Sequence, residues 1–243
     1  MWLNCDLGES FGAWRMASDE KVMPMIDQAN IACGFHAGDP LTISQTINSA
    51  VEHNLQIGAH PSYPDLVGFG RRHMAMSHEE LVACIQYQVA ALQSLVAIKG
   101  QTLKYVKPHG ALYNDVLKHE NVRHAVMSAV SEFDGLTLML QAGQHQQQWR
   151  AEASELELAL WFEAFIDRRY EADGSLRSRR LSGAVLPPEL AYQQAKLLIE
   201  KGQVVTSDGL HLSIDADTLC VHGDNPDCVA LVNKIRALLN NSQ

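Results

Sequence analysis

The sequence predicts a seven-stranded parallel (β/α) barrel, TIM-like in design, and two patterns lead to this prediction. Short apolar runs of strand length alternate with segments of helical periodicity, which is typical of a parallel sheet with helices outside it. A short polar cluster follows each apolar run, and five of the seven clusters carry Asp or His near the end of the run. In such a barrel the catalytic side chains lie at the C-terminal ends of the strands. We therefore expect one active site at the barrel mouth.

Seven apolar segments are predicted as the barrel strands. The fifth is a continuous apolar run, as expected for a strand that is buried on both faces. The strands are expected at residues 2–3 (ending at 4–6), 29–33, 55–59, 102–106, 136–140, 158–162 and 218–221. Outside this series, residues 204–214 are interrupted by Ser207, Asp208 and Gly209 and predict a hairpin.

The helices are predicted from apolar spacing and from signals at their ends. Asp39 followed by Pro40 is an N-cap with proline in the first turn, residues 77–80 match a capping box, and Gly202 ends a helix. Pro24 must lie early in the first helix or kink it. Helices are expected over residues 18–27, 40–51, 78–98, 110–117, 121–133, 144–155, 188–201 and 226–239.

Length and composition limit the class of protein. The 243 residues contain no linker rich in Gly, Ser or Pro, so one domain over 1–243 is expected, and 47% apolar residues suffice for a large core. We expect no membrane segment, because no apolar stretch reaches the ~18 residues of a span, and the N-terminus lacks the features of a signal peptide. The five cysteines are odd in number and form no CxxC pair, which indicates reduced thiols and a cytoplasmic protein.

Charge and motifs exclude several functions. The formal net charge of -9 argues against nucleic-acid binding, which needs a basic face. The sequence has no GxGxxG after its first strand and no GxxxxGK[ST], so a dinucleotide fold lacks support and a Walker-type nucleotide site is excluded.

Four side chains of the polar clusters are expected to converge, namely Asp6, His36, His60 and His109. Because glycines flank His36, its ring is expected to face a ligand rather than to pack. An aspartate with several neutral imidazoles suits a divalent metal such as zinc, and it suits proton transfer near neutral pH equally well. No HExxH pair decides between the two, and His60 and His109 could instead be core residues bonded to a carbonyl.

Charged residues of the other clusters are candidates for anion and cation binding. Lys107 could neutralise an anion or a developing oxyanion. Glu163 and Asp167 could hold Mg²⁺ through carboxylate oxygens, or could form ion pairs with the neighbouring arginines. Arg71 and Arg72 can meet phosphate or carboxylate, although a solvated loop face is an equal alternative.

The cluster of residues 222–226 lies between the last strand and the last helix. His222 is a further candidate base, and a helix N-terminus that follows glycine is suited to anions. Asp224 could bind a ligand there or could itself cap the helix.

Six stretches resemble the LamB/YcsF family, in order and over nearly the whole chain. They are LNCDLGESFG (3–12), ANIACGFHAGDP (29–40), GAHPSYPDLVGFGRR (58–72), VKPHGALYN (106–114), FEAFIDRRYEADGSLRSR (162–179) and CVHGDNP (220–226). The resemblance implies a barrel of the glycoside hydrolase/deacetylase type and the ATP-dependent opening of 5-oxoproline to L-glutamate. It also implies two partner subunits of the amidolyase type.

The implied reaction indicates which chemical roles the residues of the site would have to fill. Phosphorylation of the amide oxygen by ATP would activate the ring carbon for attack by water, which needs a base, cations for phosphate and donors for the oxyanion. The expected catalytic residues are Asp6, His36, His60, Lys107, His109, Glu163 and His222. Mg²⁺ is expected on Asp6, Glu163 and Asp167. Residues expected to bind 5-oxoproline or ATP are Asn4, Asn30, Asp39, Arg71, Arg72, Asn114 and Asp224.

Two other functions stay open at this point. The chain could be a stand-alone, metal-dependent deacetylase or amidohydrolase that needs no ATP. It could also be a non-catalytic subunit that binds the lactam for its partners. The sequence does not decide whether ATP is bound and cleaved on this chain or on a partner.

Overall fold

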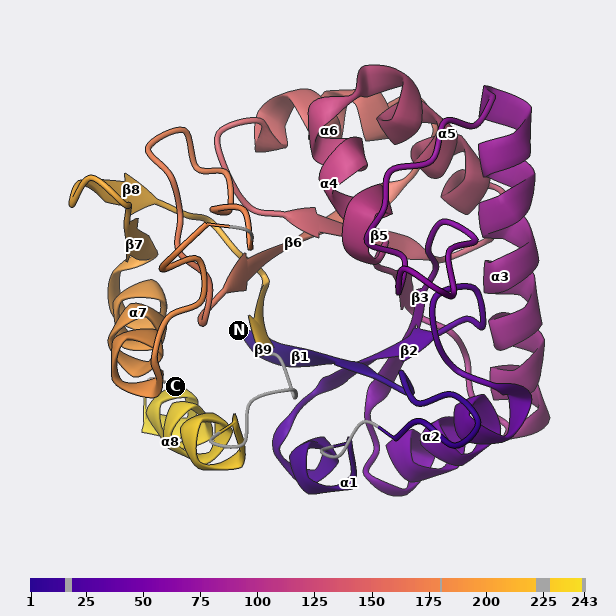
Figure 1. The fold of residues 1–243 in the computed structure, drawn as a ribbon, viewed down its shortest axis with the longest axis horizontal. Helices are drawn as coiled ribbons and strands as arrows, with labels where there is room; N and C mark the ends of the chain where they lie inside the picture. The colour runs from indigo at the N-terminus through magenta and orange to yellow at the C-terminus, as the bar shows by residue number, and fades with distance from the viewer. Residues whose placement is uncertain (16–18, 180, 222–227, 242–243) are drawn as a thin grey trace.

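A closed barrel of seven parallel strands forms the centre of the protein (Figure 1). The computed structural model describes residues 1–15, 19–179, 181–221 and 228–241. The barrel strands are β1 (Trp2–Leu7), β2 (Gln28–Ala32), β3 (Gln56–His60), β4 (Tyr105–Val106), β5 (Thr137–Gln141), β6 (Ala159–Phe165) and β9 (Thr218–Val221). Each strand pairs with the next along the chain, and β9 closes the barrel by pairing with both β6 and β1. The predicted seven-stranded parallel barrel is therefore confirmed.

Helices surround the barrel and connect its strands (Figure 1). They are α1 (Asp19–Val22), the 3-10 turn η1 (Met23–Met25), α2 (Pro40–Glu52), α3 (His78–Ile98), α4 (Gly110–Lys118), α5 (Glu120–Ser131), α6 (Gln146–Ser154), α7 (Pro188–Lys201) and α8 (Cys228–Asn241). The predicted first helix is shorter than expected, because Pro24 lies in the 3-10 turn that follows one turn of α-helix. The predicted caps are present: the Asp39 side chain accepts hydrogen bonds from the start of α2, and Ser77 and Glu80 form the capping box of α3.

Alternation along the strands separates an apolar layer from a polar interior. Leu3, Cys5 and Leu7 of β1 are buried in the hydrophobic core. Asn4 and Asp6 point the other way, into the barrel, where they meet side chains from other strands. The strands thus bury apolar side chains beneath the helices and bring polar side chains together inside the barrel.

The segment between β6 and α7 is fixed from outside the barrel. The buried amide of Gln194 on α7 donates to the carbonyl oxygens of Phe165, Ile166 and Arg168, at 2.8, 3.1 and 2.8 Å. The antiparallel pair β7 (Gln203–Val205) and β8 (His211–Ser213) follows α7 and confirms the predicted hairpin.

Helix α3 differs from its expected character. By length and hydropathy it could cross a membrane, contrary to the expectation that no segment is long and apolar enough, and 33% of the relevant window is buried. Leu81, Ile85, Val89 and Leu92 on its inner face belong to the hydrophobic core. The inner face of α3 therefore packs on the barrel.

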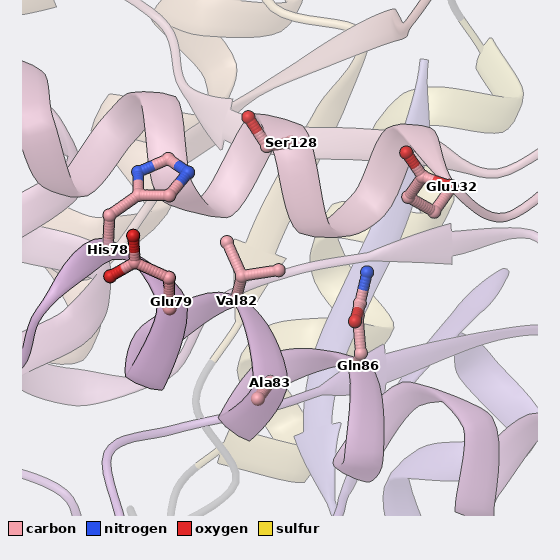
Figure 2. Close-up of a pocket in the computed structure, with 7 residues that line it drawn as sticks. All are labelled: His78, Glu79, Val82, Ala83, Gln86, Ser128 and Glu132. Carbon is pink, nitrogen blue, oxygen red and sulfur yellow. The ribbon is translucent and has the colours of Figure 1, made fainter.

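A surface pocket lies between α3 and α5 (Figure 2). Its polar lining comes from His78, Glu79, Gln86, Ser128 and Glu132. None of the predicted site residues that the structure describes line this pocket, so it belongs to the ring of helices rather than to the barrel interior.

Candidate active site

Lys107 lies at the centre of a buried polar network inside the barrel. It follows β4, and only 2% of it is exposed. Its Nζ lies 2.9 Å from Asp6 Oδ1 of β1 and 3.0 Å from Glu163 Oε2 of β6. Asn4 Oδ1 and Cys220 Sγ lie at 3.2 and 3.3 Å. Because an ammonium has three donors, these four neighbours occupy all of them.

The charge of Lys107 depends on its two carboxylate partners. Burial by itself lowers the pKa of a lysine, but the charges of Asp6 and Glu163 outweigh this effect and raise the pKa of Lys107 well above its usual value. Lys107 is therefore a permanent cation at neutral pH. Burial has the opposite effect on the adjacent thiol, because it raises the pKa of Cys220 and keeps that group neutral.

A second layer of hydrogen bonds holds the Asp6 carboxylate in place. Asn30 on β2 donates to both Asp6 Oδ1 and Asn4 Oδ1, each at 2.8 Å. The Tyr105 hydroxyl donates to Asn30 Oδ1 at 2.6 Å and so fixes the orientation of that amide. A side chain at position 58 would overlap the Tyr105 ring, so glycine is needed there on the neighbouring strand β3.

Three histidines and Glu9 form a cluster beside this network. His60 ends β3, whereas His36 and His109 follow β2 and β4. Glu9 Oε1 lies 3.2 Å from His36 Nε2 and 3.4 Å from His109 Nδ1, and His109 Nδ1 lies 3.0 Å from His60 Nε2. The cluster meets the Lys107 network at Asp6, whose Oδ2 lies 3.4 Å from His60 Nε2.

Burial controls protonation in this cluster. It lowers the pKa of both His36 and His109 well below the usual value, and the neighbouring histidines lower it further, so both rings are neutral at neutral pH. Burial also raises the pKa of Glu9, an effect that the adjacent His109 opposes.

The long loop between β3 and α3 covers the histidine cluster. The Phe69 carbonyl accepts a hydrogen bond from His109 Nε2 at 2.9 Å, and the Phe69 ring packs nearly at right angles to the His36 and His109 rings. Gly70 has a φ of +62°, and a Cβ there would come within 2.9 Å of both histidines. The loop can therefore lie directly on the cluster only with glycine at this position.

Comparison with known proteins identifies the family. The sequence matches the LamB/YcsF family over residues 1–243. The chain belongs to the LamB/YcsF family. It is 53% identical over 239 residues to the 5-oxoprolinase A subunit of Vibrio cholerae serotype O1, covering 98% of this chain and 97% of the relative. It is 50% identical over 240 residues to a 5-oxoprolinase A subunit of Pseudomonas putida, covering 98% and 93%.

A solved structure agrees with this membership. The crystal structure of the lactam utilization protein from Thermus thermophilus is similar to this chain with a TM-score of 0.91 and 38% identity. The similarity covers 100% of this chain and 96% of the other. The barrel described above is thus shared with that protein along its whole length.

In this LamB/YcsF chain the predicted catalytic residues that the structure describes lie together. The contacts of the histidine cluster connect Asp6, His36, His60 and His109. Lys107 lies between Asp6 and Glu163 and contacts both carboxylates. His36 differs from expectation, because it is completely buried beneath the loop that carries Phe69. His222 and Asp224 lie outside the described residues.

The residues predicted to bind ligands fall into three groups. Asn4 and Asn30 belong to the buried network. Arg71 is exposed, with its guanidinium 4.9 Å from the centre of the Phe69 ring, whereas Arg72 is held by the Asp65 carboxylate.

The other two predicted ligand-binding residues make local contacts. Asp39 caps α2 and also accepts a hydrogen bond from Gly12 N at 2.9 Å. Asn114 is exposed on α4 and donates to Gly110 O at 3.0 Å. Ligand binding by these two residues stays a prediction.

The structure gives no support to the predicted Mg²⁺ site. Asp6 and Glu163 share the Lys107 ammonium, which already supplies positive charge between them. Within the described part of the chain, the acidic, histidine and cysteine side chains close enough together to share a metal ion are Glu9, His36, His60 and His109, and not the three predicted carboxylates.

Sequence reasoning missed three residues of the site. Glu9 lies in the same segment as Asp6, and an acid in the loop directly after the first strand was the signal for it. Cys220 is buried as expected for a small apolar residue, yet its sulfur also contacts Lys107. No pattern in the sequence predicted that the Tyr105 hydroxyl would orient Asn30.

Proposed function

We propose that this chain is one component of an ATP-dependent 5-oxoprolinase, which opens the lactam ring of 5-oxoproline to give L-glutamate. The observation that supports it most is the full-length similarity to proteins named as the A subunits of 5-oxoprolinases. In the overall reaction ATP, 5-oxoproline and two water molecules give ADP, phosphate and glutamate. A cytoplasmic location and two partner subunits of the amidolyase type belong to the same proposal.

Within the network, Asp6 is the group best placed to act on a ligand. Its side chain is 15% exposed, against 3% for Lys107 and 0% for Glu163. Lys107 and Asn30 hold Oδ1, while Oδ2 is directed towards His60. We therefore assign Asp6 the role of general base towards water, with Lys107 and Glu163 as positioning residues.

An exposed cation at the edge of the site is suited to the anionic groups of the reactants. The Arg71 guanidinium lies over Phe69 and contributes positive charge near Glu9 and His36. Arg72 is occupied by Asp65 and stabilises the loop instead. We assign Arg71 the binding of the 5-oxoproline carboxylate or of an ATP phosphate.

Glutamate release from 5-oxoproline by the purified subunits, with and without ATP, tests this function. Glutamate should form only when ATP is present. Because the sequence has no Walker motif, we expect slow turnover by the isolated chain and at least a ~10²-fold increase on adding the partners, which corresponds to about 2.7 kcal/mol. Equal glutamate release without ATP would refute the coupling, and full activity of the single chain would place the whole ATP site on this barrel.

A stand-alone, metal-dependent amidohydrolase is the second candidate. The observation that favours it is the group formed by Glu9 and the three histidines. The two functions differ in their requirement for ATP, so the same assay separates them.

A further inference from the structure

Hydrogen bonds on the outer sides of His60 and His109 determine where their ring protons lie. His60 Nδ1 is 2.6 Å from Lys107 O, and His109 Nε2 is 2.9 Å from Phe69 O. A carbonyl oxygen can only accept, so both of these ring nitrogens carry hydrogen and donate it. The opposite nitrogens, His60 Nε2 and His109 Nδ1, are therefore the ones left to contact a ligand.

These two nitrogens face each other and two carboxylates. The nitrogens are 3.0 Å apart, Glu9 Oε1 lies 3.4 Å from His109 Nδ1, and Asp6 Oδ2 lies 3.4 Å from His60 Nε2. Each of these four atoms thus lies within 3.4 Å of the next, and those of Glu9, His109 and His60 are close enough together to share one ion. Ring nitrogens and carboxylate oxygens that face each other in a buried site repel unless a proton or a metal ion lies between them, and a metal ion is the group that several of them can share.

The geometry suits a metal ion. Ligands of a tetrahedral zinc ion at its usual bond lengths lie about 3.4 Å from one another, close to the separations in this cluster. The planes of the His60 and His109 rings are 86° apart, and His60 Nε2 and His109 Nδ1 approach each other to 3.0 Å. Each ring also donates its other N–H to a backbone carbonyl, which is the usual support of a metal-binding histidine.

His36 cannot share a metal with His109 in this arrangement. The two rings are stacked, with centroids 3.7 Å apart and an interplanar angle of 6°. Because an imidazole binds a metal in its own plane, an ion in the plane of His109 lies well out of the plane of His36. His36 Nε2 lies 3.2 Å from Glu9 Oε1 and is placed to donate to that carboxylate, while its Nδ1 is buried without a hydrogen-bond partner among the described residues.

We infer that His60 Nε2, His109 Nδ1 and Glu9 Oε1 form a binding site for one divalent transition-metal ion such as Zn²⁺. His36 positions Glu9, and Asp6 Oδ2 lies at the edge of the site. Two histidines and one glutamate leave a coordination position for water or for a ligand carbonyl. The charges of the described residues also favour a cation, because the Lys107 ammonium lies between the Asp6 and Glu163 carboxylates while the Glu9 carboxylate contacts the rings of His36 and His109.

The inference does not rest on the proposed function, because metal binding can be measured without turnover. Purified full-length chain is stripped with EDTA, and Zn²⁺ is then titrated by calorimetry at neutral pH. We expect one Zn²⁺ per chain and a higher melting temperature in its presence. His60→Ala and His109→Ala should weaken binding by more than ~10²-fold.

Three further variants separate the ligands from their surroundings. Glu9→Gln keeps the shape of the side chain and should weaken Zn²⁺ binding. This variant still tests the site if a histidine variant fails to fold. His36→Ala should keep one Zn²⁺ per chain with about 10- to 100-fold lower affinity, as expected for a residue that orients a ligand. His211→Ala, which removes an exposed histidine on β8, is the matched control and should bind as the wild type does.

Two results would overturn the inference. A wild-type chain that binds no Zn²⁺ would refute the metal site. Unchanged Zn²⁺ affinity in His60→Ala and His109→Ala would place the ion elsewhere. Neither result would show whether glutamate release depends on ATP, so the metal site and the proposed function are tested separately.

Discussion

Replacing Lys107 by methionine should destabilise the protein strongly. Methionine retains most of the length of the side chain but removes the ammonium. Asp6 and Glu163 would then lose the cation that lies 2.9 and 3.0 Å from their oxygens, in a site where Glu163 is completely buried. The variant tests whether the Lys107 network is held together by charge.

The magnitude follows from the burial of the ion pair. Removing one partner of a buried pair typically costs about 3–5 kcal/mol, because the remaining charge is left without compensation. In a chain of this size each kcal/mol lowers the melting temperature by about 2–4 °C, so a decrease of roughly 6–20 °C is expected. The pKa of Lys107 is raised well above its usual value, so its contribution is complete at neutral pH and is lost only as pH rises through that raised pKa.

Calorimetry and urea unfolding at pH 7.5 measure the effect. Lys104→Met is the matched control, since Lys104 precedes β4 and is exposed, and it should change stability by less than about 0.5 kcal/mol. A loss below about 1 kcal/mol in Lys107→Met would refute the argument that the ammonium compensates the two carboxylates.

Three other predictions concern the barrel, the rim of the site and pH. Gly58→Ala should cost about 1–3 kcal/mol or more in urea unfolding, because its Cβ would overlap a buried tyrosine ring of β4. Arg71→Ala should raise KM for 5-oxoproline or ATP with little change in melting temperature, whereas Arg72→Ala should lower the melting temperature and leave KM unchanged. Burial raises the pKa of Asp19 to about 6, so this carboxylate reduces stability as pH rises from about 4 to 6. Asp19→Asn should therefore raise the free energy of unfolding by up to about 3 kcal/mol at pH 7.5 and by little at pH 4. An equal gain at both pH values would contradict that assignment.

The fold could be predicted because its signals are local. Helix caps at Asp39 and Ser77 depend on residues three positions apart, and strand runs depend on neighbouring residues. The least accurate helix prediction was the first, where Pro24 lies in a 3-10 turn after one turn of α-helix, neither early in a longer helix nor at a kink in it. Strand ends were also displaced: β6 continues to Phe165, so Glu163 lies within the strand rather than after it.

For the site, the sequence predicted which side chains lie at the ends of the strands but not which of them are in contact. The sequence placed Lys107 and Asp6 at the same end of the barrel, but not in contact, because their contact joins residues 101 positions apart. It therefore predicted Lys107 as an anion binder, whereas the structure surrounds it with acceptors of the protein. Likewise, the glycines around His36 suggested an exposed ring, and only the fold shows that the loop with Phe69 covers it.

The most direct test of the account is glutamate release by the complete reconstituted enzyme that carries Asp6→Asn. Asn keeps the size of the side chain and removes the base, and gel filtration shows whether the subunits still assemble. We predict at least a ~10²-fold loss of kcat, with 5-oxoproline binding retained and with His211→Ala as active as the wild type. Wild-type turnover by an assembled Asp6→Asn enzyme would contradict the account, because the chemistry would then take place away from this barrel.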